Sequence, residues 1–281
     1  MNFDKIKSHA KINVALNITG KTNFFHKIES VISFISLHDE IFIREIISKT
    51  HKILFYGEFS KNINRNNTVS KLLKLLEKKK FLKDKKFHIK IKKNIPSKAG
   101  FGGGSMNASN ILKYFLKKKI IKISEKEIRN ICYLIGSDVI LGLNSTSAIL
   151  KSTNEIKFFK NYRKFHVLLV KPDFGCSTKK IYSKVQTYSK PQFQKPNRNM
   201  FKINFLKKTN NSLEPIAFSK YPKLKSIKLY LENSLKPIFV RMTGSGSALV
   251  AYYHSKDICK NAKKKINQKY KNYWCIASKT I

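Results

Sequence analysis

Cysteine and long apolar runs are both scarce in this chain of 281 residues. The four cysteines (Cys132, Cys176, Cys259 and Cys275) lie far apart, without a C-x-x-C pair. We therefore expect reduced, mostly buried thiols, and neither a disulfide framework nor a zinc site. The seven histidines are also scattered, without metal-ligand spacing. Because no apolar run could span a membrane and the N-terminus lacks the apolar core of a signal peptide, the sequence predicts a cytoplasmic protein.

Acidic residues are few, which leaves a large excess of positive charge. The chain has 16 aspartates and glutamates against 58 lysines and arginines, a formal net charge of +42. Such a charge suits nucleic acid or another anionic surface. However, lysine outnumbers arginine by 52 to 6 and is spread along the whole length, whereas recognition surfaces favour arginine for bidentate contacts. We therefore favour a compositional bias, with no specific nucleic-acid partner and only non-specific binding to polyanions.

Glycine is scarce as well, but four of the 11 glycines fall within residues 100–104. Before them, apolar and polar side chains alternate over residues 86–93, which is the period of a half-buried strand. After them, apolar residues recur at i, i+3, i+4 and i+7 from Ala108, the stripe of an amphipathic helix. The sequence therefore predicts a strand, a glycine loop and a helix.

This arrangement is typical of an anion-binding site. Glycines let backbone N–H groups approach a phosphate without interference from a Cβ atom. The following helix begins with unpaired N–H donors and the positive end of its dipole. A flexible connector is the alternative, but three consecutive glycines at a helix start argue against it. The loop is neither a Walker A motif nor the G-x-G-x-x-G of a dinucleotide-binding fold.

The loop resembles the phosphate loop of the GHMP kinases, and among them it is similar to that of the 4-diphosphocytidyl-2-C-methyl-D-erythritol kinases. The resemblance implies that ATP, with Mg²⁺, is bound by Pro96, Ser97, Lys98, Ala99, Gly100, Phe101, Gly102, Gly103, Gly104, Ser105 and Met106. The family usually has a second serine where this chain has Met106. Because a thioether is a poor Mg²⁺ ligand, Ser105 is the only candidate metal ligand from the protein.

The first predicted strand carries a second match. Residues 8–19 alternate apolar and polar side chains, and the polar face either meets solvent or points Lys11 and Asn13 into a site. The string Ala10-Lys11-Ile12-Asn13 resembles the first strand of the same kinases, which favours the second reading. The resemblance implies that Lys11 is catalytic and that Asn13 binds substrate.

A third match lies around His26, before a strand predicted at residues 28–33. The family pattern is Gly-Tyr-His, and in this chain Phe24 and Phe25 replace the first two residues. The resemblance implies that the aromatic ring stacks on a cytosine while the histidine hydrogen-bonds the base, and phenylalanine keeps the stacking face. Tyr182 stands where the family often has an aromatic residue on the other side of the cytosine.

Two further polar residues stand at predicted helix starts. Asn67 is either an N-cap residue or, as the resemblance implies, a residue near the adenine of ATP. Asp138 is either a helix cap or a functional carboxylate. The string Gly136-Ser137-Asp138-Val139 resembles the family's Gly-(Ala/Ser)-Asp-Val-Pro, whose aspartate is the proposed catalytic base. Ile140 replaces the proline, which changes the backbone restriction and not the chemistry.

The last motif lies in the C-terminal half. Residues 241–246 reproduce the family's Arg-(Met/Leu)-(Ser/Thr)-Gly-Ser-Gly, which implies that Gly244 and Ser245 bind substrate. Alone, such a turn between two strands would be a simple hairpin. Residues 211–214 predict the capped start of a helix and resemble the family's Asn-x-(Leu/Phe)-Glu. The order of strands and helices in this half is typical of a ferredoxin-like domain.

Together the resemblance implies an α+β, two-domain GHMP kinase fold. Residues 1–153 would form an N-terminal, ribosomal-protein-like α/β domain that binds ATP, and residues 154–281 a ferredoxin-like domain. The implied reaction is ATP-dependent phosphorylation of the 2-hydroxyl of 4-diphosphocytidyl-2-C-methyl-D-erythritol, in the non-mevalonate isoprenoid pathway. Asp138 would take the hydroxyl proton and Lys11 would balance charge. We expect a small-molecule cytidine-diphosphate substrate, no membrane partner, and a monomer or weak homodimer. Another GHMP small-molecule kinase, and a basic RNA-binding protein of related fold, remain as alternatives.

Overall fold

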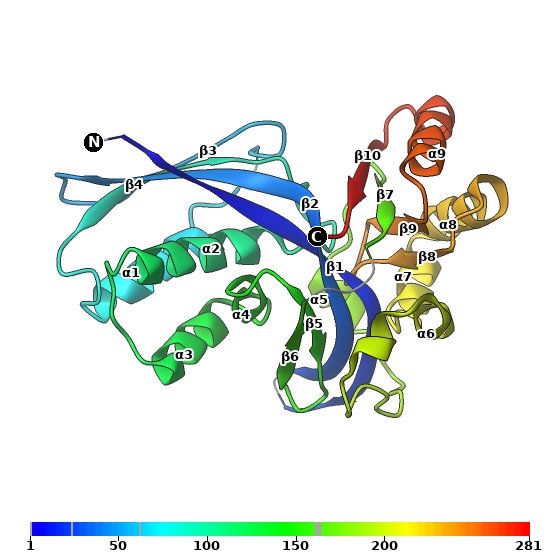
Figure 1. Ribbon diagram of the computed structural model, residues 1–281, viewed down its shortest axis with the longest axis horizontal. Helices are drawn as coiled ribbons and strands as arrows, with labels where there is room; N and C mark the ends of the chain where they lie inside the picture. Colours follow the sequence, from blue (N-terminus) through cyan, green and yellow to red (C-terminus); the bar gives the residue numbers. More distant parts are fainter. Residues whose placement is uncertain (1, 24, 62, 161–163) are drawn as a thin grey trace. The chain divides into compact units, whose positions relative to one another are not determined.

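The computed structural model describes residues 2–23, 25–61, 63–160 and 164–281 (Figure 1). Phe24, one of the replacements in the third motif, lies outside the described residues. The strands are β1 (Asp4–Lys21), β2 (His26–Ile46), β3 (Lys52–Tyr56), β4 (Lys86–Lys92), β5 (Ser147–Leu150), β6 (Ile156–Phe159), β7 (His166–Lys171), β8 (Phe239–Met242), β9 (Leu249–Tyr253) and β10 (Trp274–Lys279). The helices are α1 (Thr68–Lys78), α2 (Gly103–Lys117), α3 (Glu125–Ile135), α4 (Val139–Gly142), α5 (Thr178–Tyr182), the 3-10 helix η1 (Arg198–Phe201), α6 (Ile203–Lys208), α7 (Glu214–Lys220), α8 (Pro222–Leu235) and α9 (Lys256–Lys269).

The chain divides into two compact units that interleave along the sequence. The first unit contains residues 1–10, 37–96 and 102–145, and the second contains residues 11–36, 97–101 and 146–281. The long strands β1 and β2 therefore contribute to both units. The domain boundary expected after residue 153 stays a prediction.

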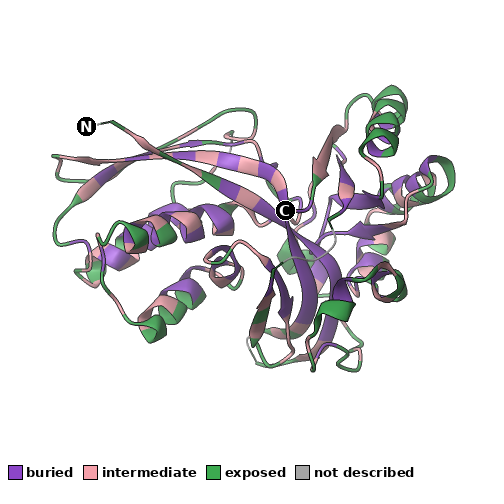
Figure 2. Ribbon diagram, viewed as in Figure 1, coloured by how far each residue is buried: buried purple, intermediate pink, exposed green. Residues whose placement is uncertain are grey.

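The first unit is a sheet with helices on one face. Strand β4 lies between β3, to which it is parallel, and the second half of β2, to which it is antiparallel. Ile43 of β2 and Ile89 of β4 belong to one core with Leu72 of α1, Leu112 of α2 and Ile131 of α3. In Figure 2 these helices are buried on one side and exposed on the other, as their apolar stripes predict.

Strand β2 is longer than the sequence predicted. Alternation indicated a strand at residues 28–33, whereas β2 runs without a break from His26 to Ile46. The additional length contains Asp39, and aspartate is disfavoured within strands. In the structure Asp39 is fully buried and accepts hydrogen bonds from residues outside β2. Those partners compensate for the low strand propensity.

The second unit contains an antiparallel sheet in the order β10-β7-β9-β8. Numbered from β7, the strand order is 4-1-3-2, with α8 and α9 in the connections, so the ferredoxin-like prediction is confirmed. Leu231 of α8 and Ile266 of α9 share a core with Leu168 of β7 and Ala251 of β9. Strands β5 and β6 form an antiparallel hairpin, and β5 pairs with the first part of β2.

The thiols behave as expected. All four cysteines are free; Cys132, Cys176 and Cys259 are buried and Cys275 is half-buried. Burial raises the pKa of the first three thiols to about 11 and that of Cys275 to about 12, so all four stay protonated at neutral pH. No helix in the described part of the chain combines the length and apolar character needed to cross a membrane.

Candidate active site

The glycine loop ends where α2 begins. Gly102 is the N-cap residue, and its φ of 67° lies in the left-handed region that favours glycine. The first helical hydrogen bond runs from the Met106 N–H to the Gly102 carbonyl at 2.9 Å. The N–H groups of Gly103, Gly104 and Ser105 precede this bond and have no acceptor within the helix. With the helix dipole, these donors can hold a phosphate group.

Two glycines at this helix start are closely packed. A Cβ atom on Gly103 would lie 3.1 Å from Cγ2 of Ile95, and one on Gly104 would lie 3.2 Å from Oγ1 of Thr68. The Thr68 hydroxyl donates to the Gly104 carbonyl at 2.6 Å. The first turn of α1 therefore fixes the first turn of α2.

Asn67 acts as the N-cap residue of α1. Its Oδ1 accepts hydrogen bonds from the N–H groups of Val69 and Ser70 at 3.0 and 3.1 Å. Its Nδ2 donates to the carbonyl of Asn64 at 2.9 Å. The capping interpretation is confirmed, and a contact with adenine stays a prediction.

A buried carboxylate anchors the strand that leads into the glycine loop. Asp39 is fully buried, and its Oδ1 accepts from the N–H groups of Asn94 and Ile95 at 2.8 and 2.9 Å. Its Oδ2 accepts from Nδ2 of Asn107 at 3.0 Å and forms an ion pair with Lys93. Since Asn107 lies on α2, this cluster joins the end of β4 to the helix that follows the loop. Local spacing gives no signal for Asp39, because the partners described here are all more than 50 residues away.

Met106 has a structural role. Its side chain is fully buried, and a Cβ atom on Gly142 of α4 would lie 3.1 Å from the Met106 sulfur. Its N–H already donates to Gly102. The residue that replaces the usual serine is therefore a core contact between α2 and α4. The predicted ATP contact of Met106 stays a prediction.

Asp138 lies at the start of α4, beside the glycine loop. A Cβ atom on Gly136 would lie 3.8 Å from Oγ of Ser105, so the turn at residues 136–138 adjoins the first turn of α2. Asp138 is half-buried, and its side chain makes no capping hydrogen bond to α4. Asp138 is thus the N-cap residue of α4 by position but not by a side-chain bond, and its role as a functional carboxylate stays a prediction.

The first half of the glycine loop packs in the second unit against the loop between β8 and β9. The N–H groups of Ser247 and Ala248 donate to the carbonyls of Lys98 and Ala99 at 3.3 and 3.4 Å. Two motifs that are far apart in the sequence are thus hydrogen-bonded to each other.

Glycine is obligatory where these two loops meet. Gly100 has a φ of 83°, and a Cβ atom there would lie 2.0 Å from the carbonyl oxygen of Thr243. Gly244 has a φ of 55°, and its Cβ position lies 3.4 Å from the Gly100 Cα atom. No other residue fits at Gly100 without separating the loops.

Lys11 and Asn13 of β1 are buried at the same place, each only 5% exposed. Nζ of Lys11 donates to Oδ1 of Asn13 at 2.7 Å, and Nδ2 of Asn13 donates to Oγ of Ser30 at 2.8 Å. The Asn13 N–H donates to Oγ1 of Thr243, and the Lys11 N–H donates to the Phe101 carbonyl. The polar face of this strand therefore points inward, toward both loops. The expected partnership of Lys11 with Asp138, which belongs to the first unit, stays a prediction.

The predicted aromatic residues lie around His26. The rings of His26 and Tyr182 are in contact, with centroids 5.2 Å apart. Burial, and then the charge of Lys21, lower the pKa of His26, so the imidazole is neutral at neutral pH and offers one donor and one acceptor. Phe25 is 61% exposed, so its face is open to a ligand. Cytosine binding by these rings stays a prediction.

Asn211 and Glu214, expected to cap a helix, instead hold the β8–β9 loop. Nδ2 of Asn211 donates to the carbonyls of Met242 and Gly244, both at 2.8 Å. Oε1 of Glu214 accepts from the Met242 N–H at 2.7 Å. Local spacing could not reveal these bonds, because the partners lie about 30 residues further along the chain.

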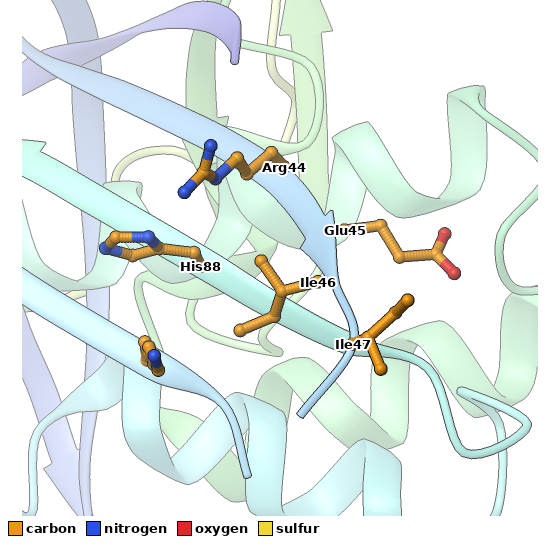
Figure 3. Close-up of a pocket in the computed structure, with 6 residues that line it drawn as sticks. Arg44, Glu45, Ile46, Ile47 and His88 are labelled. Atoms are coloured by element: carbon orange, nitrogen blue, oxygen red, sulfur yellow. The ribbon is translucent and has the colours of Figure 1, made fainter. Parts of the chain in front are cut away.

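The first unit also has a hollow of about 470 Å³ at the ends of β2, β3 and β4 (Figure 3). It is lined by Arg44, Glu45, Ile46, Ile47, Lys52 and His88. Burial, and then the charges of Lys90, Arg44 and Lys52, lower the pKa of His88, so its imidazole is neutral at neutral pH. None of the predicted site residues lines it, and it is not part of the candidate active site.

Comparison with known proteins first defines the class. The family model "GHMP kinases N terminal domain" matches residues 67–150. The fold matches a crystal structure of 4-(cytidine 5'-diphospho)-2C-methyl-D-erythritol kinase with a TM-score of 0.79 and 20% identity, over 99% of this chain and 100% of that one. It matches homoserine kinase from Cytophaga hutchinsonii with a TM-score of 0.72 and 13% identity, over 100% of this chain and 95% of that one. The two units thus have the fold of a GHMP kinase.

Relatives that match most or all of the chain then identify the family within the GHMP kinases. The chain is 57% identical over 281 residues, all of both chains, to the 4-diphosphocytidyl-2-C-methyl-D-erythritol kinase of Pelagibacter ubique. It is 33% identical over 255 residues to the enzyme of the same name from Petrotoga mobilis, covering 87% of this chain and 96% of that one. The chain therefore belongs to the 4-diphosphocytidyl-2-C-methyl-D-erythritol kinase family of the GHMP kinases.

Proposed function

We propose that this chain transfers the γ-phosphoryl group of ATP to the 2-hydroxyl of 4-diphosphocytidyl-2-C-methyl-D-erythritol. The meeting of residues 97–101 and the β8–β9 loop beside Lys11 and Asn13 carries the proposal, because it places a buried ammonium group next to both loops. Phosphoryl transfer needs positioning and charge stabilisation more than covalent help from the protein. The names of the full-length relatives supply the substrate.

The residues at the start of α2 fit the phosphates of ATP. The N–H groups of Gly103, Gly104 and Ser105 provide donors at the positive end of the α2 dipole. The Ser105 hydroxyl is an oxygen ligand of the kind that Mg²⁺ accepts. When bound, Mg²⁺ would neutralise negative charge on the phosphates.

Asp138 and Lys11 have the roles of proton acceptor and charge stabiliser. As the substrate 2-hydroxyl oxygen bonds to the γ-phosphorus, the bond from that phosphorus to the β–γ bridging oxygen breaks, and ADP leaves. The hydroxyl proton passes to the Asp138 carboxylate. The Lys11 ammonium, held by Asn13, stabilises the negative charge that develops during transfer.

The second unit provides the groups for the cytidine-diphosphate end of the substrate. Phe25 and Tyr182 would hold the cytosine ring by stacking, and the neutral His26 would pair with its edge. Asn13, Gly244 and Ser245 would contact the remainder of the substrate.

ADP release by the purified protein tests the proposed function. The assay contains ATP, Mg²⁺ and 4-diphosphocytidyl-2-C-methyl-D-erythritol, at moderate salt to suppress polyanion binding. Substrate-dependent ADP release is the expected result. ATP binding without release would favour another GHMP small-molecule kinase, to be tested with homoserine and mevalonate. Absence of ATP binding, with RNA affinity that falls steeply with salt, would favour the RNA-binding alternative.

A further inference from the structure

Asn211 is a buried amide whose side-chain donor and acceptor atoms are both used. It is 1% exposed. Its Nδ2 donates to the carbonyls of Met242 and Gly244, each at 2.8 Å, and its Oδ1 accepts from the Leu213 N–H at 2.9 Å. A single side chain thus orients two of the peptide groups in the β8–β9 loop.

The backbone around Asn211 is itself fixed to β1. The Leu16 N–H donates to the carbonyl of Asn210 at 3.0 Å, and the Ser212 N–H donates to the Leu16 carbonyl at 2.8 Å. Since β1 also carries Lys11 and Asn13, Asn211 ties the β8–β9 loop to the strand that bears the predicted catalytic lysine.

Glu214 supports the same loop from the next helix. Its Oε1 accepts from the Met242 N–H at 2.7 Å, and its Oε2 pairs with Nζ of Lys228 at 2.7 Å. Thr243 is held separately, because its Oγ1 accepts from the Asn13 N–H at 3.0 Å. The loop is therefore fixed at Met242 and Thr243, and among the described residues the hydrogen bond to the Gly244 carbonyl comes from Asn211.

The orientation of the Gly244 carbonyl determines that of the next N–H. In a trans peptide, the C=O and N–H bonds point in opposite directions. Because the Gly244 carbonyl points at Asn211, the Ser245 N–H points away from Asn211. A peptide fixed in this way presents a donor to an anion without the entropic cost of ordering it on binding.

We propose that Asn211 is a positioning residue, which sets the Gly244–Ser245 peptide so that the Ser245 N–H donates to a diphosphate oxygen of the substrate. The proposal rests on the proposed function and assigns the diphosphate, rather than the sugar or the base, to this loop. Loss of the Asn211 donor would let the peptide rotate and would weaken diphosphate binding. ATP binding would change little, because the donors at the start of α2 do not depend on Asn211.

Three variants test this role. Asn211→Ala removes the donor, and Asn211→Asp keeps the shape and the acceptor but sets a carboxylate against two carbonyl oxygens. Thr209→Val is the matched control, because it removes one buried hydrogen bond, to the Leu206 carbonyl at 2.7 Å, without touching the loop. The readouts are KM for each substrate, kcat, the Kd of cytidine 5'-diphosphate by calorimetry, and thermal unfolding.

We expect both Asn211 variants to raise the Kd of cytidine 5'-diphosphate and the KM of the cytidine-diphosphate substrate by about tenfold or more, comparable to losing one charge-assisted hydrogen bond. The KM of ATP should stay within about twofold, and Thr209→Val should leave all three constants unchanged. The Asn211→Asp defect should decrease as pH falls, since protonation of the carboxyl restores one donor.

Other outcomes separate this proposal from the proposed function. Wild-type protein that binds cytidine 5'-diphosphate without turnover would reject the kinase assignment, and the Asn211 variants would still decide the present proposal by their Kd. A folded Asn211→Ala variant with wild-type Kd and KM would overturn the positioning role. Equal losses in the Thr209→Val control would also overturn it, because they would indicate general damage. Wild-type protein with neither binding nor turnover would overturn both.

Discussion

The two ends of the glycine loop are held by different physical means. At the start of α2, in the first unit, the anchor is a buried charge: Asp39 accepts from two backbone N–H groups, Asn107 and Lys93. In the second unit the anchor is a set of neutral contacts, in which residues 97–101 bond the backbone of the β8–β9 loop. The charged anchor depends on a single side chain, Asp39, whereas the neutral anchor depends on several backbone groups. The first should fail abruptly on one substitution, whereas the second should fail only where atoms are forced apart.

The largest expected effect is the loss of turnover in Asp138→Asn, in the first unit. Replacing the carboxylate by an amide removes the proton acceptor while keeping the size of the side chain. We expect kcat to fall by roughly 10²–10⁴-fold, the range for loss of a positioned general base. Steady-state ADP release measures it.

Asp257→Asn is the control for this substitution, because Asp257 also stands at a helix start, in the first turn of α9. It should leave kcat unchanged. Near-normal turnover of Asp138→Asn would remove the assignment of Asp138 as the proton acceptor.

Asp39→Ala tests whether the anchor at the start of α2 depends on this one carboxylate. Removing this carboxylate leaves the buried Lys93 ammonium without its partner. We expect the free energy of unfolding to fall by about 3–5 kcal/mol, as for breaking one side of a buried ion pair. Urea denaturation measures the change, and the KM of ATP should rise in the same variant because α2 loses its link to β4.

Glu45→Ala provides the matched comparison, because Glu45 pairs with Lys85 at the surface, with the two side chains 38% and 42% exposed. Its loss should cost less than about 1 kcal/mol. Similar losses in Asp39→Ala and Glu45→Ala would contradict the contrast between a concentrated and a distributed anchor.

Gly100→Ala tests the neutral contacts between residues 97–101 and the β8–β9 loop, at the place where the two backbones lie closest. A Cβ atom there would lie 2.0 Å from the Thr243 carbonyl oxygen, at a φ that disfavours alanine. We expect the free energy of unfolding to fall by about 1–3 kcal/mol, the usual cost of a strained backbone position, together with a loss of turnover. Gly20→Ala, whose nearest neighbour would be 3.6 Å away, should be almost silent. A silent Gly100→Ala would show that the loops can move apart freely.

Local sequence patterns predicted elements well and long-range polar contacts poorly. The strand-loop-helix unit, the Asn67 cap and the ferredoxin-like sheet all follow from periodicity or short spacing, and the structure confirms them. Asp39 carries no local signal, because its partners lie just after β4 and on α2, more than 50 residues away. Glu214 looked like half of a capping box, although its bonds reach Met242 and Lys228. Spacing alone cannot encode such contacts.

Phe25→Ala gives a smaller effect, confined to one substrate. Phe25 is 61% exposed, so its loss should leave the free energy of unfolding unchanged. If its ring stacks on cytosine, the KM of the cytidine-diphosphate substrate should rise by about three- to tenfold, since aromatic pairs contribute about 0.5–1.5 kcal/mol. The KM of ATP should not change. Tyr133→Ala, which removes a similarly exposed ring in the first unit, serves as the control, and equal rises in both KM values for Phe25→Ala would remove the stacking role.

The smallest expected effect concerns the charge state of His26. Burial, and then Lys21, lower its pKa below the ordinary value of 6.5. The folded state therefore binds fewer protons here than the unfolded state, so this residue reduces stability only as the pH falls below that value. Lys21→Gln removes the second cause and should raise the pKa of His26 while leaving it below 6.5, because burial remains. An NMR titration of the His26 ring measures both values, and the substrate KM should rise in acid at a higher pH in the variant than in the wild type. An unchanged pKa in Lys21→Gln would show that burial alone keeps the His26 imidazole neutral. The environment of His26 would then depend on neutral groups, as the contacts between the two loops in the same unit do.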